Sequence, residues 1–522
     1  MSPIPLLQRS QLNTTPLVRI ECGQGGILLP KKLPIFYSAL LLTGVNLLLR
    51  MVATSFQVFL SGRIGAAGIG LLQLVMSVGA LSMTLGMAGI RTATMYLTAE
   101  ELGKGRKYNV TWVLSGCFIY SIACSGLISL GLQIFAPFLA EHWIGDPRTV
   151  SAIRLYGCFL PVTCLCGVMT GYFTAANRIG TLAAVEVAEQ GLYMIVTMAV
   201  LGFWAGNDPA RACQGVILGG GISSIATLTL LVALRIREHA KTGQPIPVRR
   251  RLLQCAAPLA VGDALKAGIS TTENLMVPKR LALHKAVNDP LAAFGTVCGM
   301  VFPILMFPAA IVFGLAELLI PEMARCAAAG SKLRVQYLAG RSLRVVLLFG
   351  CLCGGIEFLL AEALCLKLYN SSEAGYFLKL YALLIPMLYC DAITDAMIKG
   401  LGQQAACIRY NILTSAMDVV FLYILLPRYG MSGYFFSFLI THLINFLLSL
   451  SRLFRIAGRQ LSLKTVCSCI GTGVISAILA TYVPNPIPRA GCFAVLFFCL
   501  LFLLGVLNRE DLLWVKGLIT KK

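Results

Sequence analysis

The chain contains few charged residues. Asp, Glu, Lys and Arg make up 12% of its 522 residues, about half the fraction of a soluble domain. Hydrophobic residues make up 57%, and the mean hydropathy is +0.81. This balance excludes a soluble globular domain, and we expect an all-α, polytopic membrane protein.

Acidic residues are especially scarce, with 22 Asp and Glu against 43 Lys and Arg. The cations lie mostly in short segments between apolar stretches. No basic stretch alternates with aromatic residues, as a binder of single-stranded nucleic acid would require. We therefore expect no nucleic-acid partner.

Motifs for energy conversion and hydrolysis are also missing. The sequence contains neither G-x-x-x-x-G-K-[ST] nor H-E-x-x-H, and its four histidines are scattered. No polar segment between apolar stretches leaves room for a folded catalytic domain. The nineteen cysteines lie mostly within apolar stretches, where they pack as small apolar residues. The sequence thus predicts no enzyme activity, no cofactor and no metal site.

Fourteen apolar stretches are long enough to cross the ~30 Å hydrocarbon layer of a bilayer. They lie at about 33–61, 68–98, 110–139, 152–175, 181–204, 212–234, 252–277, 291–320, 342–364, 375–398, 408–427, 431–451, 463–483 and 491–507. With the N-terminus inside, the inner segments contain 26 Lys and Arg, the outer segments 9 and the spans 8. Because cytoplasmic loops are enriched in Lys and Arg, this asymmetry predicts a cell-membrane protein with both termini cytoplasmic.

The most basic connection lies between the sixth and seventh spans and suggests a division into two lobes. We expect two six-helix lobes around a central cavity, the arrangement of alternating-access transporters. The predicted parts are a disordered cytoplasmic tail (1–32), a first lobe (33–235), a basic cytoplasmic linker (236–251), a second lobe (252–455), and two further helices with a cytoplasmic tail (456–522).

Arg50 is the most informative single residue, because it lies near the middle of the first apolar stretch. A charge at this depth costs at least ~2.5 kcal/mol. Asn46, Arg50, Thr54 and Gln57 recur at helical spacing on one face. Such a stripe faces a cavity or another helix, so Arg50 is a candidate anchor for an anionic substrate, with Asn46 and Gln57 beside it. The alternative is a structural ion pair with a carboxylate within the membrane.

Arg91 in the second stretch is a further candidate substrate contact. The alternative is that its side chain extends toward the inner interface, where Glu100 and Glu101 follow closely. In the seventh stretch Lys266 and Glu273 share one helix face. This face either lines the cavity or forms an internally neutralised contact between helices.

Three carboxylates are candidate sites of ion coupling. Glu186 and Glu189 lie one helical turn apart in the fifth span, and Asp418 is central in the eleventh. A carboxylate at membrane depth can exchange Na⁺ or H⁺ with the flanking solutions. Glu186 and Glu189 alternatively lie near the entrance of their span, and Asp418 is alternatively buried as the neutral acid.

A separate acidic series lies near the inner end of the tenth span. Asp391, Asp395 and Lys399 are spaced at intervals of four residues, which places them on one helix face. Ion pairs at this spacing stabilise helices near the membrane interface. We therefore expect these residues to form a salt-bridged ladder.

Several segments of the sequence resemble one family of flippases. They are Gly62–Val75, Gly89–Ala93, Ala99–Glu101, Ala293–Met300 with Pro303, Pro308 and Pro321–Met323, and Lys399–Gln403. Their order and spacing are similar to those of the stage V sporulation protein B group, whose members are polysaccharide and lipid-intermediate flippases of the multidrug/oligosaccharidyl-lipid/polysaccharide exporter (MOP) superfamily. The similarity extends over most of residues 33–455.

The resemblance implies two pseudo-symmetric lobes and a cation-lined cavity. In the related lipid II flippases, cavity arginines handle the lipid-linked pyrophosphate, and Arg50 and Arg91 match two such positions by helix number. For a third cation the chain offers Lys266 or the pair Lys279 and Arg280.

The expected function is translocation of an undecaprenyl-pyrophosphate-linked saccharide for cell-envelope or spore-wall polysaccharide synthesis. Its partners are this substrate, the membrane lipids and a coupling ion, Na⁺ or H⁺. Alternating access would carry the headgroup outward. The alternatives are a multidrug or organic-cation antiporter of the same superfamily, and a non-transporting scaffold for envelope assembly.

Overall fold

The computed structural model describes residues 35–104, 106–205, 208–237, 248–458 and 462–507. Its regular elements are all helical, and no strand occurs among these residues. The predicted all-α fold is confirmed. The predicted N-terminal tail, most of the basic linker and the end of the C-terminal tail lie outside the described residues.

The helices of the first half precede the basic linker. They are α1 (Ile35–Met87), α2 (Ile90–Gly103), η1 (Lys107–Asn109), α3 (Val110–Phe138), η2 (Leu139–Ile144), η3 (Pro147–Thr149), α4 (Val150–Ala175), α5 (Ile179–Val200), η4 (Leu201–Ala205) and α6 (Pro209–Ile236).

The helices of the second half follow the linker. They are α7 (Val248–Leu281), α8 (Pro290–Gly295), η5 (Thr296–Val301), α9 (Phe302–Leu305), α10 (Ala309–Ala328), α11 (Lys332–Tyr369), α12 (Ser372–Ala382), α13 (Ile385–Gly400), α14 (Gln404–Ala457), α15 (Leu463–Ala480) and α16 (Pro486–Leu503).

Two very long helices are each interrupted by one glycine. Gly65 in α1 has φ 69° and Gly430 in α14 has φ 57°, values outside the helical range. Glycine adopts positive φ without the steric cost that a side chain imposes. Both breaks fall where the sequence places a turn between two spans, so α1 and α14 each comprise two membrane segments.

The helix inventory of the described residues is consistent with fourteen spans. Nine helices are long and apolar enough to cross a membrane, and two bent pairs bring the number to eleven. Counting α1 and α14 twice because of their breaks adds two, and the shorter apolar helix α15 adds one.

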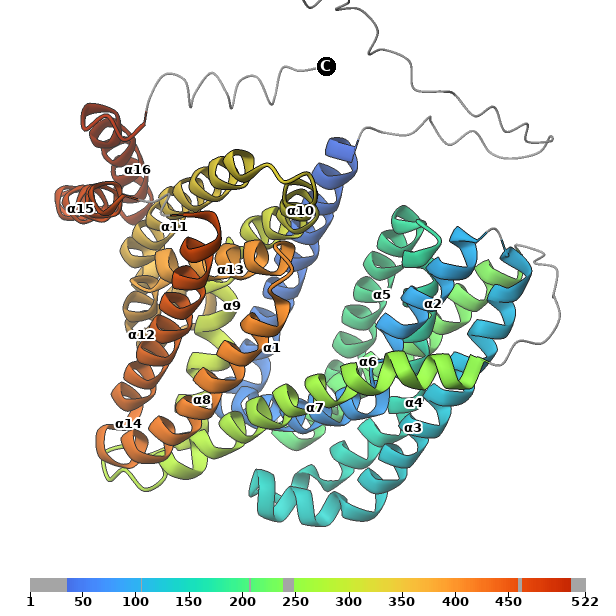
Figure 1. Cartoon of the computed structure of the whole chain (residues 1–522). Helices are drawn as coiled ribbons and strands as arrows, with labels where there is room; N and C mark the ends of the chain where they lie inside the picture. Colours follow the sequence, from blue (N-terminus) through green and yellow to red (C-terminus); the bar gives the residue numbers. More distant parts are fainter. Residues whose placement is uncertain (1–34, 105, 206–207, 238–247, 459–461, 508–522) are drawn as a thin grey trace, which may run out of the picture.

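The helices form two groups that diverge toward one end of the molecule (Figure 1). One group contains α2–α6 and the other contains α8–α14, while α1 and α7 run between them. Helices α15 and α16 pack against α11 at the edge of the second group. We call the end that carries the start of α1 the inner end, and the opposite end the outer end.

Helix α1 comes into backbone contact with the second group where it crosses α8. A Cβ atom on Gly295 would lie 2.0 Å from the carbonyl oxygen of Ala66, and one on Gly70 would lie 2.2 Å from the carbonyl oxygen of Leu291. Only glycine permits such an approach, which membrane helices use to pack closely. This crossing joins the two groups near the first turn of the chain.

The charge asymmetry of the connections predicts the orientation in the membrane. Reporter fusions after Lys241 and Lys516 should give a cytoplasmic signal, and a fusion near Asp146 should give an external one, because Lys and Arg are retained on the inner side. Paired alkaline phosphatase and fluorescent-protein fusions measure this directly. An external signal at Lys241 would contradict the proposed topology.

Candidate functional site

Arg50 lies in the first half of α1 with a partly buried side chain. Its charge acts on the phenol of Tyr389 in α13, which places the guanidinium near the second group. None of the ion pairs in the described part of the chain includes Arg50. The described residues therefore give no support to the structural ion pair, the alternative considered from the sequence.

The remaining polar residues of the Arg50 stripe follow α1 between the two groups. Gln57 donates a hydrogen bond from Nε2 to the carbonyl oxygen of Gly299 in η5, at 3.1 Å. One residue earlier, Phe56 packs edge-on against Tyr193 of α5, with ring centroids 5.2 Å apart. Helix α1 thus contacts both groups at this level. The side chain of Asn46 lies outside the described residues.

Arg91 and Glu186, predicted separately, are brought together in the first group. Arg91 is exposed in the first turn of α2, and its charge acts on the exposed carboxylate of Glu186 in α5. Glu189, one turn further along α5, is partly buried beside Thr227 of α6. None of the described ion pairs joins Arg91 to Glu186, so their charges interact at a longer range than a salt bridge.

The polar residues of α7 contact two different helices, α1 and α14. Lys266 is exposed. Thr271 donates to the carbonyl oxygen of Ser77 at 3.1 Å, and Asn274 donates to the Ser77 hydroxyl at 3.0 Å, which ties α7 to α1. Glu273 points instead to α14, where it lies beside Ser415 and near Asp418.

Asp418 is the centre of a partly buried acidic cluster in the second group. Its Oδ1 accepts hydrogen bonds from the hydroxyls of Ser437 at 2.5 Å and Thr441 at 3.3 Å. Glu273 and His442 lie close enough to Asp418 for their charges to interact with its carboxylate. Two carboxylates and two hydroxyls form an oxygen-rich environment suited to a proton or a hard cation such as Na⁺.

A row of polar residues continues this cluster along α14 toward the inner end. Asn445 donates to both carboxylate oxygens of Asp391, at 3.1 and 3.3 Å, and Ser449 donates to Asp395 at 2.9 Å. The structure therefore gives Asp391 and Asp395 amide and hydroxyl partners, and none of the described ion pairs joins them to Lys399 as the ladder hypothesis expected.

Sequence reasoning missed the partners of these carboxylates. The signal was present, because Ser437, Thr441, Asn445 and Ser449 recur every four residues in the twelfth apolar stretch. That spacing places all four on one helix face. Such a row predicts a polar contact with a neighbouring helix. The acidic residues of the tenth and eleventh stretches provide the hydrogen-bond acceptors for it.

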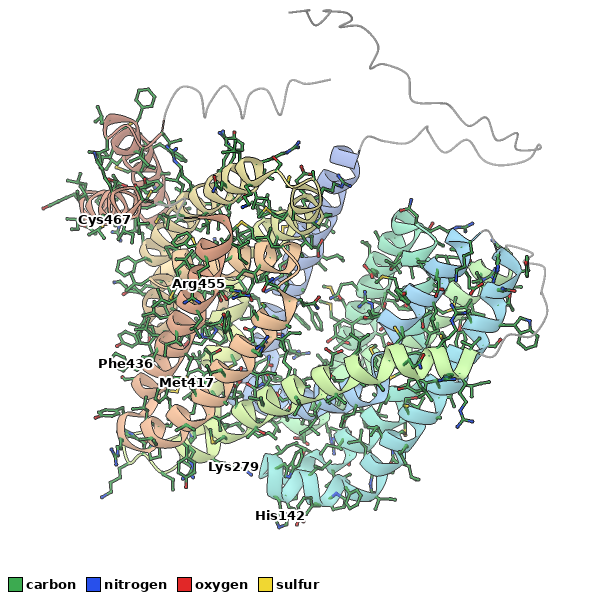
Figure 2. The ribbon with its side chains drawn as sticks, viewed as in Figure 1. His142, Lys279, Met417, Phe436, Arg455 and Cys467 are labelled. Atoms are coloured by element: carbon green, nitrogen blue, oxygen red, sulfur yellow. The ribbon has the colours of Figure 1, made fainter. Side chains whose placement is uncertain are left out.

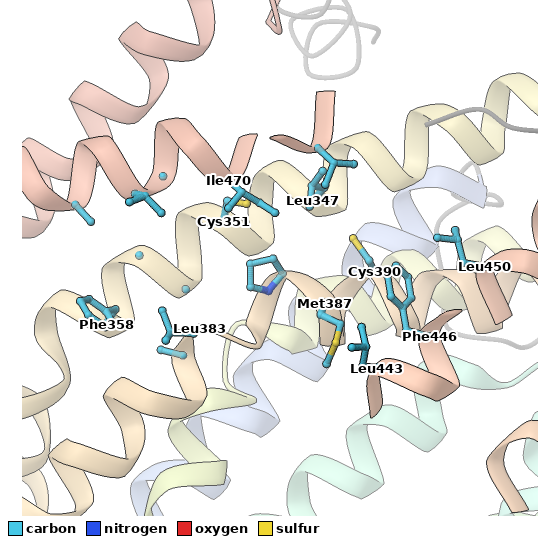
Figure 3. A pocket seen from close by; sticks show the side chains of 18 of the residues that line it. Leu347, Cys351, Phe358, Leu383, Met387, Cys390, Leu443, Phe446, Leu450 and Ile470 are labelled. Carbon is cyan, nitrogen blue, oxygen red and sulfur yellow. The ribbon is translucent and has the colours of Figure 1, made fainter. Parts of the chain in front are cut away.

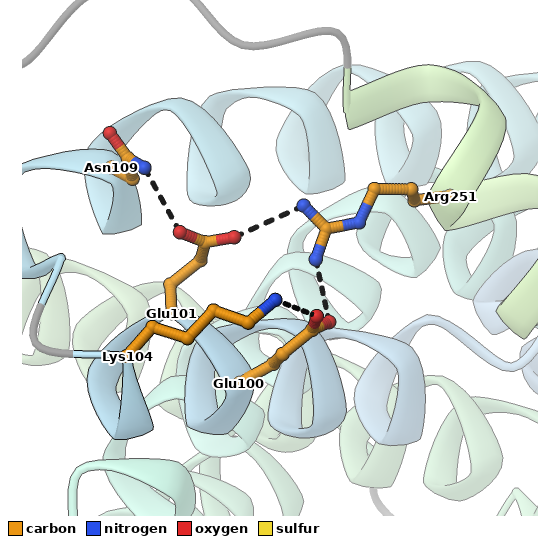
Figure 4. A network of polar contacts seen from close by, with 5 residues as sticks. All are labelled: Glu100, Glu101, Lys104, Asn109 and Arg251. Carbon is orange, nitrogen blue, oxygen red and sulfur yellow. Dashed lines mark hydrogen bonds and ion pairs between the residues drawn. The ribbon is translucent and has the colours of Figure 1, made fainter.

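A charged network at the inner end fastens α7 to the first group (Figure 4). Arg251 at the start of α7 bridges two carboxylates of α2, at 2.6 Å from Glu100 and 3.0 Å from Glu101. Asn109 donates a hydrogen bond to Glu101 at 2.9 Å, and Lys104 forms an ion pair with Glu100. Glu100 and Glu101 are the carboxylates toward which Arg91 was alternatively expected to extend. The structure pairs them with Arg251.

Replacing Arg251 should destabilise the start of α7. The side chain of Glu101 is 2% exposed, and an unpaired buried acceptor costs about 1–3 kcal/mol. We expect Arg251→Gln to lower the thermal midpoint of the detergent-solubilised protein, and Glu101→Gln to restore part of it in the double variant. Arg249→Gln, at an exposed neighbouring position, is the matched control. Equal midpoints for the Arg251 and Arg249 variants would show that the network contributes no stability.

An apolar cavity of about 740 Å³ lies on the flank of the second group, between α11, α13, α14 and α15. Figure 3 shows Phe358, Met387, Phe446 and Ile470 among the side chains that line it. None of the described residues that line the cavity is charged. Its chemistry fits a hydrocarbon chain.

The fold is similar to that of solved transporters, among them one of the MOP superfamily. A multidrug resistance MATE family transporter of this superfamily, in an inward-facing conformation, aligns with a TM-score of 0.62 and 14% identity over 79% of this chain and 98% of its own. Lipid II flippase MurJ, in an inward closed conformation, aligns with a TM-score of 0.65 and 12% identity over 89% and 97%. These likenesses establish the fold.

A curated relative agrees with the resemblance seen in the sequence. Stage V sporulation protein B of Bacillus subtilis (strain 168) is 23% identical over 406 residues, which cover 74% of this chain and 77% of the relative. No family model matches the chain. The predicted resemblance to this group and to the MOP superfamily is thus confirmed, and the chain is a multi-pass membrane protein with a transporter fold.

Proposed function

We propose that the chain is a flippase that moves a lipid-linked saccharide, anchored by an undecaprenyl-pyrophosphate, across the cell membrane. The observation that carries this proposal is Arg50. It is a partly buried cation on the helix between the two groups, and no ion pair of the described residues neutralises it. A guanidinium presents a planar fork of donors that matches phosphate oxygens, so its natural partner is an anionic headgroup.

The arrangement of the helices supports transport by alternating access. The two groups diverge toward the inner end and meet near the α1–α8 crossing (Figure 1). With the inner end cytoplasmic, as the charge asymmetry predicts, Arg50 accepts the headgroup from the cytoplasmic side. Separation of α1 from α8 would then release it on the outer side.

The apolar cavity beside α15 supports an amphiphilic substrate (Figure 3). A flippase binds the headgroup in a polar interior while the lipid tail stays in an apolar environment. Apolar side chains such as Phe358, Met387 and Phe446 line most of the cavity. It provides a place for part of the polyprenyl chain during translocation.

Ion coupling is proposed at the cluster of Asp418 and Glu273. The two carboxylates lie near each other on α14 and α7, and α7 runs between the two groups. A proton or Na⁺ bound there reduces the repulsion between the carboxylates and so favours one position of α7 over another. Ion binding would in this way bias the conformational equilibrium.

An organic-cation antiporter is the second candidate. It is favoured by the exposed carboxylate of Glu186 and by Glu189 and Asp418, which together provide acidic groups for a cationic substrate. A drug antiporter should protect cells against cationic dyes. A flippase for lipid-linked saccharides should leave dye sensitivity unchanged.

Analysis of lipid-linked precursors in a deletion strain tests the proposal. A flippase for these intermediates should cause undecaprenyl-pyrophosphate-linked saccharides to accumulate, with the headgroups facing the cytoplasm. Complementation with the wild-type chain should reverse this, and complementation with an Arg50→Ala variant should not. Unchanged precursor levels together with increased dye sensitivity would favour the antiporter.

A further inference from the structure

A second cavity, of about 670 Å³, lies at the outer end of the molecule. Residues of both helix groups line it, including Leu81 of α1, Trp143 of η2 and Tyr423 of α14. The C-terminal half of α7 forms its remaining wall and contributes Lys279 and Arg280. Figure 2 shows Lys279 and His142 at this end, far from the diverging ends of the two groups.

The cavity carries two adjacent positive charges. In the described part of the chain, no acidic residue lines the cavity, and no ion pair includes Lys279 or Arg280. Cations on the outer side run against the charge bias of membrane proteins. Interaction with the C-terminal end of α7 accounts for part of their placement, but no described carboxylate neutralises the two charges.

The hydrogen-bond donors of both cations remain available to a ligand. Lys279 donates one hydrogen bond to the carbonyl oxygen of His142, and an ammonium has three N–H groups. The guanidinium carbon of Arg280 lies 3.2 Å from the ring centroid of Tyr423. Stacking uses the face of the guanidinium and leaves its edge free, and this edge forms the fork that binds phosphate.

The other walls of the cavity are apolar or amphipathic. Leu81, Leu275, Met276 and Leu283 provide hydrocarbon surface next to the cations. Trp143 is 37% exposed, and tryptophan is typical of the membrane–water interface, where its ring lies at the level of lipid headgroups. Charged donors beside an apolar wall fit an amphiphile better than a free ion.

We propose that this cavity binds the phosphate headgroup of a lipid in the outer half of the membrane, with Lys279 and Arg280 holding the phosphate. Two sources offer this chemistry, a resident anionic phospholipid and the lipid-linked phosphate that leaves the transporter. The second source rests on the proposed function, whereas the first does not. In either case the headgroup contacts α7, α14 of the second group and η2 of the first, at the outer closure of the two groups.

Fluorescence quenching tests the site in the full-length chain. A variant with Trp143 as its sole tryptophan (Trp112→Phe, Trp204→Phe, Trp514→Phe) is reconstituted in vesicles containing phosphatidylglycerol or phosphatidylcholine with brominated chains. We expect brominated phosphatidylglycerol to quench Trp143 at least twofold more strongly at equal mole fraction. The double change Lys279→Gln, Arg280→Gln should abolish this preference.

Two further variants separate loss of the site from loss of folding or of net charge. The exchange Lys279→Arg, Arg280→Lys keeps both charges and should keep the preference. The change Arg211→Gln, Lys285→Gln removes the same net charge from exposed positions outside the cavity and should also keep it. Equal quenching by the two lipids, or a preference that survives in the Lys279→Gln, Arg280→Gln variant, would overturn the proposal.

Competition identifies the source of the phosphate. Unlabelled undecaprenyl phosphate should relieve quenching by brominated phosphatidylglycerol if the site receives lipid-linked phosphates. Unrelieved quenching assigns the site to a resident phospholipid. Because no transport is measured, a failure of the proposed function would leave this result unaffected.

Discussion

Arg50→Ala is expected to reduce headgroup translocation by about 10- to 100-fold while leaving expression and thermal stability near those of the wild type. The first part follows from the loss of charge-assisted hydrogen bonds to phosphate, which contribute about 1.5–3 kcal/mol. The second part follows because the described ion pairs do not include Arg50, so its removal leaves no known carboxylate unpaired. The measurement is the translocation rate of a lipid-linked saccharide in proteoliposomes, with the thermal midpoint measured in parallel.

Arg50→Lys and Arg63→Ala are the informative controls. Lysine keeps the charge but lacks the planar fork, so it should restore only part of the rate. Arg63 is exposed in the turn that ends the first half of α1, and its replacement should leave the rate unchanged. If Arg50→Ala instead unfolds the protein, and neutralisation of a carboxylate rescues it, Arg50 is a structural ion pair.

Asp418→Asn is expected to abolish the response of transport to one imposed ion gradient. Asparagine keeps the shape of the side chain and its contacts with Ser437 and Thr441, but cannot exchange a proton or neutralise Na⁺. With separate gradients of pH, Na⁺ and membrane potential, the rate stimulated by one of the two ions should fall about tenfold or more, since a charge-assisted interaction is lost. The effect of the membrane potential on the charged substrate should persist.

Glu273 provides a second test of the same cluster. Because Glu273 lies near Asp418, the two carboxylates should act as a unit, and the double change with Glu273→Gln should add little to either single change. Glu362→Gln is the matched control, since this carboxylate is exposed on α11. Full ion stimulation in the Asp418→Asn variant would make the cluster structural.

The helical class and the break points could be predicted because each depends on local sequence. Hydrophobic length and charged punctuation locate the spans, and the breaks of α1 and α14 fall at glycines that the sequence places between spans. The proximity of Arg91 to Glu186 required the structure. These residues lie on different helices, and hydropathy contains no information about which helices are neighbours.

Burial of the acidic residues required tertiary information as well. From the sequence, Asp391 and Asp395 have a cation four residues further on, and a local ion pair is the simplest expectation. The structure shows that α14 presents Asn445 and Ser449 to them instead. Likewise, the sequence offers Lys279 and Arg280 as a candidate cation pair, but only the structure shows that α1, η2 and α14 line the same cavity.

Translocation of a lipid-linked saccharide by the purified chain tests the central claim most directly. Proteoliposomes carrying a fluorescent undecaprenyl-pyrophosphate saccharide are treated with a membrane-impermeant quencher, and the fraction that becomes accessible is followed over time. We predict that the wild-type chain accelerates this transfer and that Arg50→Ala does not, while a zwitterionic phospholipid probe moves at the same rate with and without protein. Equal transfer in protein-free vesicles, or exchange of organic cations with no transfer of the saccharide, would contradict the account.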